Sequence, residues 1–132
     1  MSAPAWAERY IGLPFEDPGR GPAYDCWGLA RLVLAARFGR VLPDYGYDYV
    51  AADDRGSVPR AIESGLREGW QRVEQPTAGD LIVFRIFGRT THVGLVLELP
   101  WFLHIHEGIG SAIERVDARL WARRIEGYYR YG

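Results

Sequence analysis

The stretch "AYDCWGLARLVLAARFG", residues 23–39, decides the fold because it holds both a well-marked helix and the only cysteine of the chain. Asp25 is a favourable N-cap, and Gly39 is a favourable residue just after the last turn. The apolar residues that recur at the spacing of one helix face are Leu29, Leu32, Val33 and Ala36. The stretch therefore predicts a helix from Cys26 to Phe38, with Cys26 in its first turn.

The size and composition of the chain favour one globular domain over residues 1–132. At 132 residues, a chain can bury a core of its own without metals or disulfides. Hydrophobic residues make up 48% and charged residues 25%, which is typical of a folded protein and not of a disordered one. Sixteen basic residues are balanced by seventeen acidic ones, so the net charge of −1 argues against a nucleic-acid partner.

The same sequence gives no sign of a membrane or of an oxidising compartment. A single cysteine excludes an internal disulfide. No segment approaches the roughly 18 consecutive apolar residues that a spanning helix needs. The first residues also lack the basic start and apolar run of a secretory signal peptide. We therefore expect a protein made in the cytoplasm that does not insert into a membrane.

The order of the predicted elements is that of an α+β domain. Residues 4–10 can form one or two helical turns, and Ser57 can cap a helix that runs to about Glu68. Turn residues dominate the stretch 65–80 that follows. The β-rich runs are "LIVFRIF" at 81–87, "HVGLVLEL" at 92–99, "WFLHIHE" at 101–107, "SAIERV" at 111–116 and "GYYRYG" at 127–132. Helices first and strands later predict helices packed on an antiparallel meander.

Cys26 is a candidate nucleophile because of its place at the start of a helix. The unpaired N–H groups and the dipole of a helix N-terminus favour the thiolate, which is the reactive form. The alternative is an inert buried thiol, since cysteine without a disulfide is among the most buried residue types and packs as a small hydrophobe. Position alone leaves both interpretations open.

A cysteine nucleophile needs a base, and the chain offers three histidines in its strand-rich half: His92, His104 and His106. If the runs at 92–99 and 101–107 pair about a turn centred on Glu98, His92 faces His104. A turn centred one residue later pairs His92 with His106, and the pattern does not separate these registers. In either register one imidazole can take the thiol proton while another orients it.

Two further possibilities concern a metal and the aromatic residues. The "HIH" at 104–106 places two imidazoles on one strand face, but a structural zinc site generally needs four Cys or His ligands. Such a site would use Cys26 and every histidine, so we predict neither a metal nor another cofactor. Tyr10 precedes the loop that leads to Cys26, so its hydroxyl can reach a cleft there; the alternative is a packing role.

The motifs together resemble the NlpC/p60 family of cysteine peptidases. They are "YDCWGLARLVL" at 24–34, "PTAGDLIVFRIFGRTTHVGLVLE" at 76–98 and "FLHIHEG" at 102–108, and the resemblance covers about residues 6 to 131. It implies a papain-like α+β fold. The form of the cysteine motif and the short tail at 121–132 are most similar to the small phage and gene-transfer-agent members, and to the peptidase domain of tail assembly protein K.

The resemblance also implies roles for individual residues. Cys26 matches the nucleophile, His92 the base, and His104 the third polar residue, which favours His104 over His106 and the first of the two registers. Tyr10 matches the tyrosine of the family's cleft, and Trp27 is expected to form a wall of it. The implied substrate is a peptidoglycan stem peptide, typically cut between D-γ-glutamyl and a diamino acid.

The implied setting is a phage tail or a gene-transfer-agent particle that opens the cell wall, with tail or baseplate proteins as partners. A particle component would be assembled inside the producing cell and would act on the wall from outside. The alternative is a catalytically silent tail-tip or baseplate subunit that uses the same cleft to bind a partner chain, which the aromatic loop at 44–50 also fits.

Overall fold

The computed structural model describes residues 2–16, 19–43, 69–86 and 89–131. The helical segments are the 3-10 helix η1 (Ala5–Tyr10), α1 (Cys26–Phe38) and α3 (Arg119–Ala122). The strands are β1 (Trp70–Val73), β2 (Leu81–Ile86), β3 (Arg89–Val96), β4 (Trp101–His106), β5 (Gly110–Arg115) and β6 (Ile125–Tyr131). The predicted helix from Ser57 to Glu68 and the aromatic loop at 44–50 lie outside the described residues.

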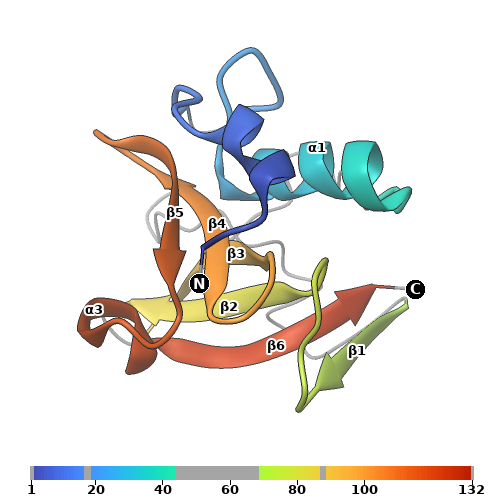
Figure 1. Ribbon diagram of the computed structural model, residues 1–132, viewed down its shortest axis with the longest axis vertical. Coiled ribbons are helices and arrows are strands. Elements are labelled where there is room, and N and C mark those ends of the chain that lie inside the picture. The colour runs from blue at the N-terminus through green and yellow to red at the C-terminus, as the bar shows by residue number, and fades with distance from the viewer. Residues whose placement is uncertain (1, 17–18, 44–68, 87–88, 132) are drawn as a thin grey trace.

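The strands of the described residues form one six-stranded sheet in the order β1-β6-β2-β3-β4-β5. Its pairs are antiparallel, and β2 to β5 follow one another as a meander. The last strand, β6, returns to the far side of β2, where it also pairs with β1 (Figure 1). The predicted α+β fold with an antiparallel meander is confirmed.

Strand β1 is a correction to the sequence analysis, which expected turn residues throughout 65–80. Four residues are too short to show an alternating pattern, so the strand depends on its partner for recognition. The partner is β6, which pairs Trp70 with Tyr131. The two rings lie 4.9 Å apart between centroids, and Trp70 is buried in the main core. Tertiary packing and not local sequence therefore makes this segment a strand.

The predicted helix α1 is confirmed at both ends. The Asp25 carboxylate accepts a 2.6 Å hydrogen bond from the Gly28 N–H, and Gly39 follows the last turn with φ of 66°. Helix α1 packs across β3 and β4 (Figure 1), so the main core lies between helix and sheet. None of the described helices combines the length and the apolar character needed to cross a bilayer.

The segment before the cysteine is fastened to both layers. The predicted helical turns at 4–10 are confirmed as η1, whose Trp6 lies against Phe38 at the end of α1 with ring centroids 5.7 Å apart. At its other end, the Ser111 hydroxyl donates to the Tyr10 carbonyl and accepts from the Leu13 N–H. These contacts tie η1 to both α1 and β5.

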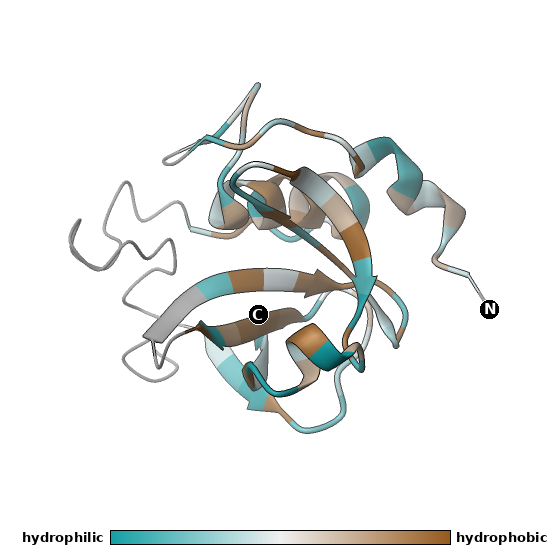
Figure 2. Ribbon diagram, turned by 90° about the vertical axis from the view of Figure 1, so that its left-hand side faces the viewer, coloured by the Kyte–Doolittle hydropathy of each residue, from teal (hydrophilic) through white to brown (hydrophobic). Residues whose placement is uncertain are grey.

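A second, smaller core lies on the other face of the strands. In both views the strands lie between α1 and the short helix α3 (Figures 1 and 2). Trp121 of α3 is buried there with residues from three strands. The members of this cluster are Ile82, Phe84, Val96, Phe102 and Trp121. The sheet is therefore covered on both faces, which fixes the direction of every side chain on its central strands.

Candidate active site

Strands β3 and β4 pair in the second of the two registers considered above. The observed pairs are Leu95 with Leu103 and Val96 with Phe102. The same register, continued toward the start of β3, places His92 opposite His106 and diagonal to His104. The preferred register with a turn centred on Glu98 is therefore wrong, because Leu97 N–H bonds to the Trp101 carbonyl and shifts the turn by one residue.

The two histidines nevertheless meet. His92 Nε2 and His104 Nδ1 lie 2.8 Å apart, a hydrogen bond between diagonal neighbours on one face of the sheet. The ladder between β2 and β3 shifts register at Phe84 and Arg85, directly where Phe84 pairs with His92. Such an irregularity increases the local twist and redirects a side chain. The contact itself is diagonal, and not direct as expected, because of the register between β3 and β4.

Two residues that the sequence analysis did not identify continue this contact. His104 Nε2 lies 2.6 Å from Glu114 Oε2, and Trp121 Nε1 donates to Glu114 Oε1 over 3.0 Å. His92, His104, Glu114 and Trp121 thus form a continuous line of hydrogen bonds across β3, β4, β5 and α3, which we call the polar row. It begins at the predicted base.

Aromatic packing fixes the orientation of the row. The Trp121 ring stacks on His92 with centroids 5.9 Å apart and meets His104 edge-on at 4.8 Å. Phe84 covers His92 from β2 at 5.5 Å. Only 7% of His92 and 1% of His104 is exposed. Both imidazoles are therefore held by neighbours on several sides, and neither can turn without disturbing the second core.

Burial sets the charges in the row. It is the main reason why the pKa of His92 lies well below its usual value, and the nearby His104 and His106 lower it further. Burial also lowers the pKa of His104 to about 4, although the hydrogen bond to Glu114 acts in the opposite direction. For Glu114 burial raises the pKa, but hydrogen bonds from Trp121 and His104 outweigh it and leave the pKa lowered. At neutral pH both histidines are neutral and Glu114 is ionised.

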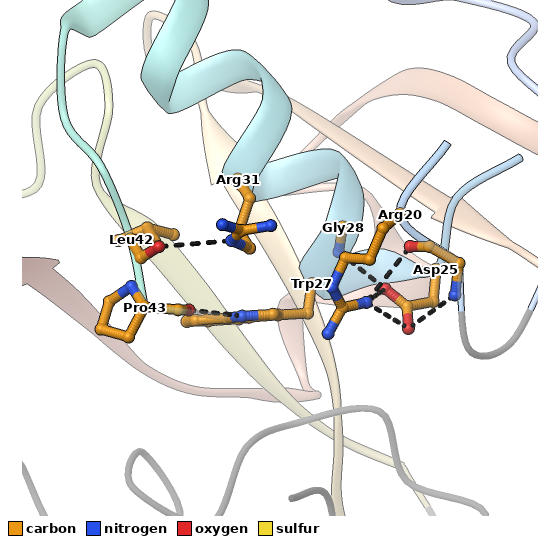
Figure 3. Close-up of polar contacts among 8 residues, drawn as sticks. Arg20, Asp25, Trp27, Gly28, Arg31, Leu42 and Pro43 are labelled. Carbon is orange, nitrogen blue, oxygen red and sulfur yellow. Dashed lines mark hydrogen bonds and ion pairs between the residues drawn. The ribbon is translucent and has the colours of Figure 1, made fainter. Parts of the chain in front are cut away.

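Cys26 is placed by a rigid helix start. The Asp25 side chain is fully buried and binds both the Gly28 N–H and the guanidinium of Arg20, whose NH1 lies 2.9 Å from each carboxylate oxygen (Figure 3). Burial raises the pKa of Asp25, although the bonds to Gly28 and Arg20 act to lower it. The predicted N-cap is confirmed, and it is locked more firmly than a surface cap.

Gly28, the glycine of the cysteine motif, is required because there is no room for a side chain at its position. A Cβ at Gly28 would lie 2.0 Å from the carbonyl oxygen of Gly19, so no other residue fits without moving the backbone. Gly19 in turn exchanges hydrogen bonds with Asp25, its N–H with the carboxylate and its carbonyl with the Asp25 N–H. The loop before Cys26 therefore rests directly on the first turn of α1.

The structure brings the three histidines together and places Cys26 on the helix that packs on their strands. Cys26 is 4% exposed and belongs to the main core, together with Val93, the residue after His92. The ring of His92 contacts Phe84, and the ring of His104 contacts Trp121. The sulfur and the imidazoles thus come from two layers that meet at β3 and β4.

Trp27 and Tyr10 were predicted to contact substrate, and their burial differs little from that of core residues. Trp27 is 0% exposed, donates to the Pro43 carbonyl over 3.1 Å (Figure 3) and packs on Trp70 at 5.8 Å. Its ring supports the start of the helix from within the core, and its role as a wall of the cleft stays a prediction. Tyr10 is 8% exposed and packs in the same core as Cys26.

A group of metal-type ligands overlaps the polar row and adds His106 to two of its members. One ligand atom each from His104, His106 and Glu114 lies within 4.8 Å of the others. His104 Nε2 and Glu114 Oε2, however, are 2.6 Å apart, whereas two ligands of one tetrahedral zinc ion are separated by about 3.3 Å. The spacing of this pair fits a shared proton and not a shared metal ion.

Glu114 and Trp121 carried little signal in the sequence. Glu114 lies on β5 opposite Phe102, so it reaches His104 only as a diagonal neighbour. Trp121 comes from a helix of four residues that shows no period. The one available signal was the run "SAIERV", where an acidic residue interrupts a short strand next to the histidine-bearing one. The contact of Glu114 with His104 depends on the register of β4 and β5, and its contact with Trp121 depends on the packing of α3, so the sequence alone did not show either.

Comparisons with known proteins agree with the fold. A family model described as the NlpC/P60 family matches residues 12–130. No curated protein matches the chain. One similar solved structure is the NlpC/p60 domain of the peptidoglycan hydrolase SagA, with 25% identity and a TM-score of 0.59 over 96% of this chain and 92% of that one.

Two other similar structures are longer proteins. One, from Staphylococcus aureus subsp. aureus Mu50, is described as similar to lipoprotein of the NLP/P60 family; it has 28% identity, a TM-score of 0.63, and coverage of 95% of this chain and 38% of its own. The other, an NlpC/P60 family protein from Bacillus cereus ATCC 10987, has 22% identity, a TM-score of 0.67, and coverage of 98% and 41%. The chain spans less than half the length of these two proteins.

The family model covers the cysteine motif, all three histidines and Glu114, and the α+β fold is shared with the solved domains. With its helix-starting cysteine and histidine-bearing strands, the chain belongs to the NlpC/P60 family of cysteine peptidases.

Proposed function

We propose that this domain hydrolyses a peptide bond in the stem peptide of peptidoglycan, with Cys26 as nucleophile, His92 as base and His104 as the residue that orients His92. The observation that carries the proposal is the 2.8 Å contact between His92 Nε2 and His104 Nδ1. A base held by a second polar group is the arrangement that activates a cysteine nucleophile. The relationship to the SagA peptidoglycan hydrolase domain supports the substrate class.

The reaction has two halves, formation of a thioester on Cys26 and its hydrolysis, and His92 takes up and returns a proton in each. Cys26 Sγ gives its proton to His92 and attacks the carbonyl carbon, so that a C–S bond forms. The carbon–nitrogen bond breaks as His92 returns the proton to the leaving amine, which leaves a thioester. Water then attacks the thioester while His92 takes the water proton, and that proton finally restores the thiol. The net reaction adds one water across one amide bond.

The helix start supports the first step. The N-terminus of α1 carries the N–H groups and positive end of the dipole that favour a thiolate at Cys26. The same N–H groups are the economical source of an oxyanion hole. The firm anchoring of Asp25 and Gly28 keeps this end of the helix in one position. Transfer of the proton from Cys26 to His92 is the step on which the proposal depends.

The finer parts of the proposal rest on the resemblance of the cysteine motif and of the short tail. The bond cut is the one between D-γ-glutamyl and a diamino acid. The domain acts on the cell wall as part of a phage tail or gene-transfer-agent particle, with tail or baseplate proteins as partners. The competing possibility is a silent structural subunit of the same particle. The line of bonds from His92 to Glu114 favours the enzyme, because a scaffold has no need of an ionised partner for two buried histidines.

The test is digestion of purified muropeptides by the wild-type chain and by Cys26→Ala, with the SagA domain in parallel. We expect new amino termini on a diamino acid, detected by mass, with wild type and none with the variant. Products that lack the lactyl–alanine linkage would instead identify an amidase. A fully folded chain that releases no peptide while the SagA domain does so would overturn the proposal in favour of the structural subunit.

A further inference from the structure

We infer that Glu114, held by Trp121, is a positioning residue that sets the proton positions of both histidines and so leaves His92 Nδ1 as the basic nitrogen. This inference rests on the proposed function, because it assigns a role within the same reaction. It follows from the directions of three hydrogen bonds, which can be worked out from the end of the polar row back to its beginning.

The carboxylate of Glu114, between His104 and Trp121, can only accept hydrogen bonds. Glu114 receives the Trp121 indole N–H at Oε1, and an indole nitrogen is always a donor. Its other oxygen, Oε2, faces His104 Nε2 at 2.6 Å. Since an ionised carboxylate has no proton to give, His104 Nε2 must carry the hydrogen.

The remaining proton positions follow. A neutral His104 protonated at Nε2 has a lone pair at Nδ1, and that atom faces His92 Nε2 at 2.8 Å. His92 Nε2 must therefore be the donor of this bond. Neutral His92 then has its lone pair at Nδ1, which is the nitrogen that would take the proton of Cys26 in the proposed reaction. Glu114 thus determines which nitrogen of His92 is basic, although two hydrogen bonds separate them.

The same line of bonds stabilises the charged intermediate. When His92 accepts a proton it becomes an imidazolium in a buried site, which is costly without a compensating charge. The negative charge of Glu114 reaches it through the neutral ring of His104. Removing that charge should weaken proton transfer but not substrate binding.

A glutamine cannot replace Glu114, and the reason gives a sharp test. Both neighbours of Glu114 present an N–H, whereas an amide has one accepting oxygen and one donating NH2. In Glu114→Gln, if the oxygen keeps the Trp121 bond, the NH2 faces His104 and forces its proton to Nδ1. His92 must then accept at Nε2 and carry its own proton at Nδ1, where it no longer acts as a base.

Removing the Trp121 donor should relieve this conflict. In the double variant Trp121→Phe with Glu114→Gln, the amide oxygen is free to turn to His104 and restore the original tautomers. We expect kcat to decrease about 10- to 100-fold in Glu114→Gln, with KM nearly unchanged, and to recover several-fold in the double variant. If Glu114 only supported the fold, removing the Trp121 hydrogen bond as well would not be expected to raise kcat again.

Two readouts accompany the kinetics. Nitrogen-15 NMR of the histidine rings reports each tautomer directly, and we expect Nε2–H at His92 and His104 in wild type and Nδ1–H at both in Glu114→Gln. The pH dependence of Cys26 alkylation by iodoacetamide reports the thiol pKa, which should rise toward the ~8.5 of an ordinary thiol in Glu114→Gln. Neither readout requires peptidoglycan.

The matched control is Glu126→Gln. Glu126 is another partly buried carboxylate that accepts hydrogen bonds, from Tyr129 and Arg72, but it lies on β6 outside the polar row. Glu126→Gln should leave the histidine tautomers, the alkylation of Cys26 and kcat unchanged. Identical tautomers in wild type and Glu114→Gln, or a double variant no better than the single one, would overturn the inference. Dependence of the tautomers and of the Cys26 pKa on Glu114 in a chain that cuts no peptidoglycan would support it and overturn the proposed substrate instead.

Discussion

His92 Nε2 and His104 Nδ1 share a 2.8 Å hydrogen bond although the register of their strands places His92 across from His106. The contact is diagonal, and so is the next one, from His104 to Glu114 on β5. Diagonal neighbours on one face are within reach of long and aromatic side chains. The polar row thus crosses three strands obliquely, in the same sense at both steps.

Cys26→Ala should abolish turnover and leave the fold nearly intact. The change removes one sulfur atom from the first turn of α1, and the helix keeps its cap at Asp25. We expect a change in the free energy of unfolding of about 1 kcal/mol or less, against roughly 2 to 5 kcal/mol for a large core truncation. Thermal unfolding beside a peptide-release assay checks both parts. A large loss of stability would mean that Cys26 is chiefly a packing residue.

Replacing His104 should separate its role from that of His106. His104→Asn keeps a polar side chain but breaks the hydrogen bonds that connect His92 to Glu114, so we expect a large decrease in kcat. His106→Asn leaves both bonds in place and should reduce activity far less, because no bond of the polar row involves His106. Steady-state rates on one purified muropeptide compare the two. Equal losses would show that the observed register, with His92 opposite His106, governs the chemistry.

Buried neutral histidines make stability depend on pH. The pKa of His104 is about 4 in the fold, below the ordinary value of 6.5, so below pH 6.5 the unfolded chain binds more protons than the folded one. Stability is therefore fully present above about pH 6.5 and is lost as the pH decreases toward 4. The largest contribution from His104 is about 3 kcal/mol. The lowered pKa of His92 acts in the same direction.

Urea unfolding of wild type and His104→Asn at pH 7, 6 and 5 measures this effect. The wild-type free energy of unfolding should decrease across the series more steeply than that of the variant, since asparagine does not titrate. A wild-type curve parallel to the variant's would contradict the buried neutral state of His104.

The sequence predicted α1 and the strands of the meander because their signals are local. Asp25 and Gly39 mark the helix ends through backbone chemistry, and the runs at 81–87 and 101–107 carry their own β propensity. What it could not predict depends on partners far away in the chain. Strand β1 exists because β6 pairs with it, and Glu114 joins the site as a diagonal neighbour of His104 across the pair of β4 and β5.

The steric fit at Gly28 leads to a prediction about the helix start. Gly28→Ala puts a methyl group 2.0 Å from the Gly19 carbonyl oxygen, so the loop before Cys26 must move. We expect a loss of about 1 to 3 kcal/mol in stability, and slower alkylation of Cys26 because the first turn shifts. Gly39→Ala is the control: its Cβ meets open space, so it strains a left-handed position but leaves Cys26 alone. Similar alkylation rates in the two variants would contradict this account of Gly28.

Trp27 gives the clearest contrast between a cleft wall and a core residue. Its ring is fully buried, bonds to the Pro43 carbonyl and packs against Trp70. Trp27→Phe keeps an aromatic ring but leaves a gap and an unpaired carbonyl, so stability should decrease by about 1 to 3 kcal/mol. The KM for a muropeptide should stay within about twofold of wild type, since buried atoms make no contact with substrate. Denaturation and steady-state kinetics on the same preparations measure the two quantities. A KM that rises several-fold while stability is unchanged would instead identify Trp27 as a wall of the cleft.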